Sequence, residues 1–333
     1  MIGAMLLATR LTERLGLRHP VVLAPMAFAA GGRLAAAVSR AGGLGLIGGG
    51  YGDRAWIDAQ FDEAERADVG CGFITWSLAR APDVLDHVLE RRPRAVMLSF
   101  GDPRPFAPRV REAGIPLLCQ VQSRSDAELA VEAGAQVIAA QGAEAGGHGD
   151  RRATLTLVPE IADLLAARSP ETLLCAAGGI ADGRGVAAAL MLGADGVLVG
   201  TRLWATVEAN VADAMHAAAV AADGDATIRT SVPDIARRLD WPERFTARVL
   251  RNSFTERWHG RESELQGAIE GVARDWAEGW AAGDPERANT FVGEAIALIG
   301  TIEPAGAVVE RMAAEAAALL AKAPRMAVAS PDG

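Results

Sequence analysis

Eight short apolar runs, separated by segments with a helical pattern, constrain the fold of this chain more than any other feature. Each run has the length of a strand buried on both faces, which a parallel sheet requires. The runs occupy residues 21–26, 43–48, 69–75, 95–100, 116–121, 136–140, 172–177 and 196–200. Eight strand–helix units that close on themselves predict an α/β fold of the (β/α)8 TIM-barrel type, with an open doubly wound sheet as the alternative.

The segments between the runs carry helix boundary signals. Residues 125–133 begin at capping residues and end at Gly134, and residues 182–192 end at Gly193. A last apolar-faced helix is predicted over 307–320, where it would close the barrel wall.

The residue pattern of the sequence changes after the eighth run. Residues 207–284 are polar and helical in pattern, contain four of the seven tryptophans and show no strand-like run. We therefore expect a TIM-barrel domain from 1–206 and 285–323, a helical insertion or cap over 207–284, and a flexible tail over 324–333. The tryptophans of the insertion are expected to pack in a shared core.

Composition excludes several classes of function. The chain has 333 residues, of which 50% are hydrophobic, so it can bury a large core. The net charge of -9 and the absence of a Lys/Arg cluster argue against nucleic-acid and membrane partners. No apolar run is long enough to span a bilayer, and we expect a cytoplasmic protein.

The three cysteines are odd in number, widely spaced and each set in an apolar run. This pattern predicts buried thiols in a reducing compartment. It predicts neither disulfides nor a metal site.

One histidine is placed where chemistry is expected. The glycine-rich stretch 141–149 follows the sixth run and contains His148. Glycines let the backbone turn sharply, and the active sites of such barrels gather at the carboxyl ends of the strands. We expect His148 at the barrel mouth, whereas Glu144 is interpreted as a turn residue or backbone cap without a catalytic role.

A Gly-Gly pair and a Gly-Thr pair indicate a phosphate site. Gly178-Gly179 follows the seventh run, and Gly200-Thr201 follows the eighth. Loops at these places often bind phosphate because glycines admit an anion close to backbone N–H groups and a helix N-terminus. The chain has no Walker lysine motif and no Gly-x-Gly-x-x-Gly after its first strand, which argues against a nucleotide triphosphatase or a dinucleotide fold.

These motifs, in this order, resemble one family. They are Ala24-Pro25-Met26, Gln141-Gly-Ala-Glu-Ala-Gly146-Gly147-His148, Thr154-Leu-Thr-Leu-Val-Pro159, Ala177-Gly178-Gly179-Ile180 and Gly200-Thr201-Arg202. The chain resembles the nitronate monooxygenases, formerly called 2-nitropropane dioxygenases. The resemblance runs from about residue 11 to 205 and resumes at 293–299.

The resemblance implies an FMN-dependent TIM barrel that oxidises alkyl nitronates, such as propionate 3-nitronate, with O2 to a carbonyl compound and nitrite. By position, His148 would be the catalytic residue. The flavin ring and ribityl chain would be contacted by Met26, Thr75, Gln120, Gln141, Gly146 and Gly147. The phosphate would be held by Gly178, Gly179, Gly200 and Thr201. Relatives commonly have asparagine at the position of Thr75, so this contact departs from the family pattern; a hydroxyl replaces only one of the amide's hydrogen bonds.

The chemistry of an imidazole suits this activity. Removing the α-proton of a neutral nitroalkane calls for a base whose pKa lies near the working pH. With a substrate that is already ionised, a donating His148 would instead hold the nitronate oxygens.

Two alternatives remain open. Related barrels are NAD(P)H-dependent flavin reductases of quinones or of enoyl groups on acyl carrier protein. A non-catalytic flavin- or phosphate-binding barrel is the third hypothesis, and the position of His148 argues against it. The resemblance is compatible with a homodimer.

Overall fold

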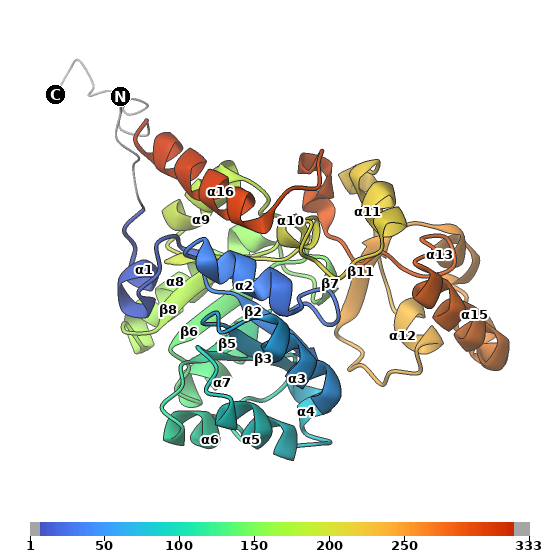
Figure 1. Ribbon diagram of the computed structural model, residues 1–333, viewed down its shortest axis with the longest axis horizontal. Helices are drawn as coiled ribbons and strands as arrows, with labels where there is room; N and C mark the ends of the chain where they lie inside the picture. The colour runs from blue at the N-terminus through green and yellow to red at the C-terminus, as the bar shows by residue number, and fades with distance from the viewer. Residues whose placement is uncertain (1–6, 323–333) are drawn as a thin grey trace.

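Eight parallel strands form the barrel of the computed structural model, which describes residues 7–322 (Figure 1). The strands are β1 (Val21–Leu23), β2 (Leu46–Gly50), β3 (Gly70–Ile74), β4 (Val96–Ser99), β5 (Leu117–Val121), β6 (Val137–Gln141), β8 (Leu173–Ala177) and β9 (Gly196–Val199). Their order is β1-β9-β8-β6-β5-β4-β3-β2, and a parallel bridge between Val22 and Leu44 connects the two end strands. The predicted TIM barrel is confirmed, and the open sheet is excluded.

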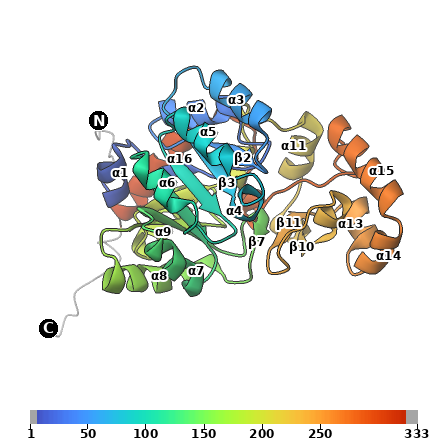
Figure 2. The same cartoon turned by 90° about the horizontal axis from the view of Figure 1, so that it is seen from below.

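Helices surround the barrel (Figure 2). They are α2 (Gly32–Arg40), α3 (Arg54–Glu63), α4 (Thr75–Leu78), α5 (Asp83–Glu90), α6 (Ala107–Glu112), α7 (Arg124–Glu132), α8 (Thr154–Arg168), α9 (Gly183–Met191), α10 (Thr201–Trp204) and α16 (Ala305–Leu320). The predicted helices appear as α7, α9 and α16, and α16 packs against α9 and α2. Within residues 7–322, no helix is long and apolar enough to cross a membrane.

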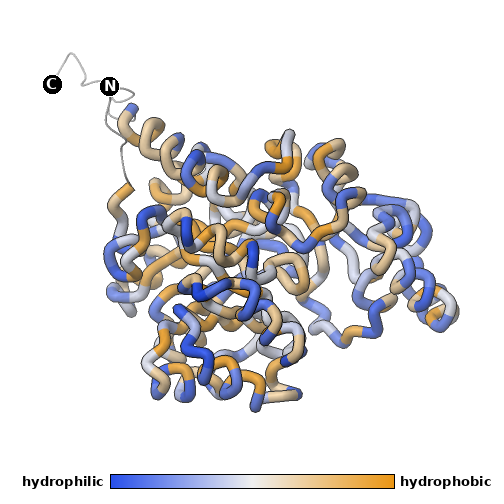
Figure 3. The backbone as a smooth tube through the Cα atoms, in the orientation of Figure 1, coloured by the Kyte–Doolittle hydropathy of each residue, from blue (hydrophilic) through white to orange (hydrophobic). Residues whose placement is uncertain are grey.

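The core has two layers because each strand is buried on both faces. One layer lies between the strands and the surrounding helices, where α2 contributes Leu34 and Val38. The other fills the barrel, and α1 (Arg10–Leu15) adds Leu11 and Leu15 to it. Figure 3 shows the apolar residues concentrated along the inner strands and the polar ones on the outer turns of the helices.

After α10 the chain leaves the barrel wall and forms the lobe at the right of Figure 1. The elements of this lobe are α11 (Asp213–Val220), η1 (Gly224–Ala226), β10 (Thr227–Thr230), α12 (Val232–Ala236), β11 (Thr246–Leu250), α13 (Ser253–Trp258), α14 (Glu262–Gly267) and α15 (Ile269–Ala282). The chain then returns through η2 (Glu294–Leu298) to α16.

The expectation that this insertion contains no strand is wrong. β10 pairs antiparallel with β11, and β11 pairs with β7 (Gly147–Gly149) in the loop after β6. In this register Ala247 lies opposite His148. The insertion is therefore tied by backbone hydrogen bonds to the stretch that carries the candidate catalytic histidine.

The insertion also shares a hydrophobic core with the barrel mouth. Trp258 and Trp276 are buried in this cluster with Trp204 of α10, and Trp280 stacks on Trp276 with ring centroids 5.3 Å apart. Packing is thus confirmed for these tryptophans, whereas Trp241 lies elsewhere. The division of the chain at residues 207 and 284 stays a prediction, and the predicted tail at 324–333 lies outside the described residues.

Candidate active site

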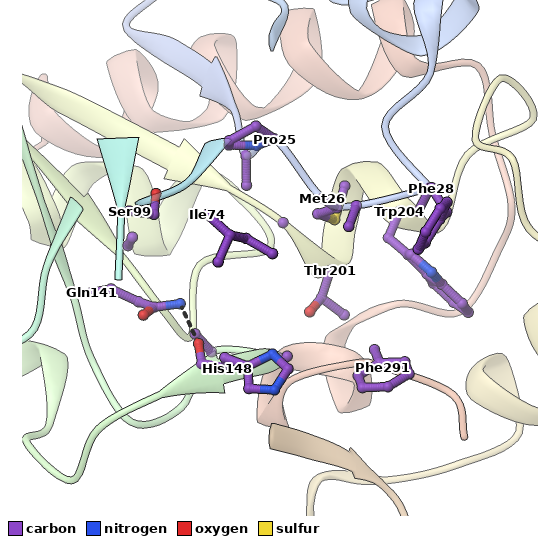
Figure 4. Close-up of a pocket in the computed structure, with 18 of the residues that line it drawn as sticks. Pro25, Met26, Phe28, Ile74, Ser99, Gln141, His148, Thr201, Trp204 and Phe291 are labelled. Carbon is purple, nitrogen blue, oxygen red and sulfur yellow. Dashed lines mark hydrogen bonds between the residues drawn. The ribbon is translucent and has the colours of Figure 1, made fainter. Parts of the chain in front are cut away.

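A cavity of about 520 Å³ lies at the carboxyl ends of the barrel strands, between the barrel and the insertion. Most of the predicted site residues line it. These are Met26, Gln120, Gln141, Gly146, Gly147, His148, Gly178, Gly179, Gly200 and Thr201. Figure 4 shows Met26, Thr201 and His148 around the same space. The structure therefore brings together residues from five separate stretches of the sequence.

Thr75 is the predicted site residue that the structure does not place on the cavity lining. Its neighbour Ile74 does line the cavity. The Thr75 hydroxyl is buried and has no hydrogen-bond partner among the described residues. A flavin contact from Thr75 stays a prediction.

The backbone that carries His148 is fixed by a chain of amide groups. Gln141, the last residue of β6, donates from Nε2 to the carbonyl of His148 at 3.1 Å (Figure 4). Gln120 and Gln122 at the end of β5 both donate to Oε1 of Gln141, at 3.0 and 2.9 Å. Both predicted glutamines are thus held in one network beside the cavity.

Two arginines of the insertion brace the same loop. Arg229 of β10 donates to the carbonyls of Gly149 and Ala143, each at 3.1 Å, and Arg248 of β11 donates to Ala143 at 3.0 Å. Burial lowers the pKa of Arg229 to about 10. Hydrogen bonds from charged donors are stronger than neutral ones, so these contacts fix the loop against the insertion.

The imidazole of His148 is enclosed by two insertion residues. Nε2 lies 2.9 Å from Oδ2 of Asp234, and the indole of Trp241 stacks on the ring with centroids 3.4 Å apart and planes 4° apart. Burial lowers the pKa of His148, and the hydrogen bond from Nε2 to the Asp234 carboxylate opposes this. Burial therefore favours the neutral form of the ring.

Neither Asp234 nor Trp241 was expected from the sequence. Asp234 is 86 residues from His148 along the chain, and its contact depends on the pairing of β11 with β7. The sequence contains no motif or residue spacing from which this contact could be predicted.

Gly178-Gly179 and Gly200-Thr201 form the end of the cavity predicted to take a phosphate. Gly178 and Gly179 have φ angles of 101° and 73°, a region that side chains rarely adopt. Thr201 begins α10, and its hydroxyl accepts a hydrogen bond from the backbone N–H of Gly293 at 2.9 Å. The hydroxyl hydrogen of Thr201 therefore remains available to an acceptor in the cavity.

In the described part of the chain, several buried polar atoms of residues that line the cavity lack a hydrogen-bond partner that a ligand could supply. The Ser99 hydroxyl, the Asn289 amide nitrogen and the Thr290 hydroxyl have no hydrogen-bond partner within residues 7–322. Leaving such groups unpaired costs about 1–3 kcal/mol each. A ligand rich in hydrogen-bonding atoms, as a flavin nucleotide is, fits this lining.

Glu144 has a structural role. Its carboxylate accepts from the backbone N–H of Thr154 at 3.0 Å and from the Thr154 hydroxyl at 2.8 Å. Thr154 is the first residue of α8, whose N-cap residue Ala153 makes no side-chain cap. The interpretation of Glu144 as a backbone cap is confirmed.

The cavity also holds one cationic side chain. The Arg237 guanidinium, next to α12, lies 5.3 Å from the ring centre of Tyr51 and 5.7 Å from those of Trp276 and Phe291. Its salt-bridge distance to Asp234 is 3.9 Å. The lining thus carries positive charge close to His148.

Comparison with known proteins matches nearly the whole chain to one protein family. A family model described as nitronate monooxygenase matches residues 8–70 and 74–315. The nitronate monooxygenase of Neurospora crassa is 33% identical over 90% of this chain and 89% of its own length. Nitronate monooxygenase npaC of Metarhizium robertsii is 35% identical over 90% of this chain and 91% of its own length. Among solved structures, FabK from Thermotoga maritima aligns with a TM-score of 0.84 and 31% identity, over 96% of this chain and 100% of that one.

Proposed function

This chain belongs to the nitronate monooxygenase family and is a flavin-dependent oxidoreductase; we propose that it uses FMN and O2 to oxidise small alkyl nitronates, such as propionate 3-nitronate, to a carbonyl compound and nitrite. The observation that carries the proposal is that His148 lines one cavity together with Gly178-Gly179 and Gly200-Thr201. Membership of an enzyme family leaves no support for the non-catalytic alternative.

The residues present fit FMN. The phosphate would lie against Gly178, Gly179 and Gly200, where backbone N–H groups and the Thr201 hydroxyl are the donors. The unpaired Ser99 hydroxyl and the amides of Gln120 and Gln141 would hydrogen-bond the polar parts of the flavin and the ribityl chain. When bound, FMN supplies the electron transfer and the chemistry with oxygen.

The role of His148 depends on the substrate supplied. Because burial favours its neutral form, the ring accepts the α-proton of a neutral nitroalkane. With a nitronate no proton has to be removed; the neutral ring has no second N–H to donate because Nε2–H faces Asp234, and the nearby Arg237 charge would favour the anion. Trp241, Tyr51 and Phe100 form an aromatic wall of the cavity.

A second candidate is the NAD(P)H-dependent reduction of quinones or of enoyl groups on acyl carrier protein. The TM-score of 0.84 with FabK favours keeping it. Both candidates use the same barrel and the same cofactor site, so the overall fold does not discriminate between them.

The test is nitrite release with oxygen uptake from propionate 3-nitronate by the FMN-loaded protein. We expect nitrite from the wild type with the nitronate and, with the corresponding neutral nitroalkane, a loss on the order of 100-fold in kcat/KM for His148→Asn, the lower end of what a positioned acid–base group contributes. His87→Asn, on helix α5 outside the cavity, is the control and should retain activity. Oxidation of NAD(P)H without any nitrite from the nitronate would favour the second candidate.

A further inference from the structure

Asp234 contacts the candidate catalytic histidine from a different part of the chain. Its carboxylate oxygens lie 3.0 and 2.9 Å from Nε2 of His148. The two side chains are only 6% and 8% exposed, so water competes weakly for this contact. An ionised carboxylate can only accept hydrogen bonds, and Nε2 must therefore carry the hydrogen.

The other ring nitrogen, Nδ1, is left free. It has no hydrogen bond to any residue in 7–322, and the ring faces the cavity (Figure 4). The ring cannot easily flip, because Trp241 stacks on its face at 3.4 Å. Trp241 is itself held by a hydrogen bond from its Nε1 to the Tyr51 hydroxyl at 3.2 Å.

We propose that Asp234 is a positioning residue that fixes the tautomer of His148, so that Nδ1 is the atom that exchanges a proton with the substrate. The inference rests on the proposed function. With a neutral nitroalkane, the Cα–H bond breaks and the proton forms an N–H bond at Nδ1. The electron pair moves onto the nitro group, which becomes the nitronate, and Asp234 stabilises the imidazolium that results.

The inserted segment thus supplies part of the reaction centre as well as a cover for it. Asp234 and Trp241 both lie between β10 and β11, and β11 pairs with the strand that carries His148. The three contacts together fix the position, plane and tautomer of one ring.

The charges around His148 determine the sign of the pH effect. Asp234 and Arg237 face the ring from α12 and the residues that follow it, and Arg229 faces it from β10. Burial lowers the pKa of His148, Asp234 raises it, and both arginines lower it. Removing the carboxylate leaves only lowering influences, so the pKa of His148 falls further.

The test compares Asp234→Asn with Asp240→Asn in the FMN-loaded enzyme. Asp240 is a matched control, because it lies in the same segment and pairs at the surface with Arg80 at 3.0 Å. We expect Asp234→Asn to lower kcat with a neutral nitroalkane by roughly 10- to 100-fold, as is typical when a partner that orients a histidine is lost. In the pH profile of kcat, the rise that reflects deprotonation of His148 should move to lower pH. Asp240→Asn should leave both unchanged.

Nitrogen NMR of the histidine ring gives a readout that does not depend on turnover. We expect the wild type to show Nε2 protonated and Nδ1 unprotonated, with the signal assigned by its loss in His148→Asn. A wild-type ring with the hydrogen on Nδ1 would overturn the inference, even if Asp234→Asn fails to fold. An Asp234→Asn enzyme with unchanged tautomer, pH profile and kcat would also overturn it. Absence of nitrite formation by the wild type would instead count against the proposed function alone.

Discussion

A single added methyl group at Gly146 should disable the site. A Cβ at this position would lie 2.5 Å from the backbone nitrogen of Gly293 and 2.5 Å from the carbonyl carbon of Val292. Its φ angle is not in the left-handed region, so the conflict is purely steric.

The size of the effect follows from the geometry. Both atoms belong to backbone, and real Cβ contacts under 3.0 Å essentially never occur, so the two segments must separate by about 0.5 Å at least. Overpacking of this kind costs roughly 1–3 kcal/mol of folding free energy. His148 lies two residues further along the same loop, and a misplacement near 1 Å lowers catalysis by on the order of 100-fold.

We therefore expect Gly146→Ala to lower the free energy of unfolding by about 1–3 kcal/mol. We also expect it to reduce kcat/KM for the nitronate by on the order of 10- to 100-fold. Urea denaturation, nitrite assays and the FMN content of the purified protein measure these effects. Gly271→Ala is the control, because its Cβ would meet nothing within 4 Å in α15; it should raise stability slightly, by roughly 0.5–1 kcal/mol. A Gly146→Ala enzyme with wild-type stability, FMN content and activity would refute the reasoning.

Three further predictions concern capping, acid stability and thiol reactivity. Glu144→Ala removes the carboxylate that caps Thr154 and should lower the free energy of unfolding by about 1 kcal/mol in urea denaturation, whereas Glu144→Gln should retain most of it; equal values for the two variants would contradict the capping role. Burial lowers the pKa of His148, so the unfolded chain binds the extra proton first and stability should fall as pH drops below about 6.5; His148→Asn should flatten this decline, and an unchanged slope in denaturation at several pH values would be inconsistent with it. Burial raises the pKa of the Cys71 and Cys119 thiols to about 12 and also raises the pKa of Cys175. A thiol reagent should therefore modify these three cysteines only after unfolding. Rapid reaction of the native protein would argue against their burial.

The barrel could be predicted because its signal is local. Each buried strand corresponds to an apolar run of five to seven residues in the sequence, such as the one that contains β8, and the helices between carry caps and terminal glycines. The cavity residues followed from the rule that parallel strands present their carboxyl ends at one edge. Ten of the predicted site residues line that cavity.

The insertion sheet could not be predicted because its signal is weak and non-local. β10 reads Thr-Ile-Arg-Thr and β11 reads Thr-Ala-Arg-Val-Leu, short strands in which polar residues alternate with apolar ones. The partner of β11 is β7, three residues of a glycine-rich loop about a hundred residues earlier in the chain. Asp234 and Trp241 reach His148 only through this pairing. Thr75 is a separate case: it directly follows β3 in the chain, but its hydroxyl is buried away from the cavity lining.

Anaerobic mixing of the FMN-loaded protein with propionate 3-nitronate and, separately, with NAD(P)H tests the proposed function most directly. The flavin spectrum is recorded in each case. We expect rapid loss of the oxidised flavin absorbance with the nitronate and no change with NAD(P)H. Reduction by NAD(P)H alone would contradict the proposed function in favour of a reductase, and a protein that takes up no FMN would contradict both.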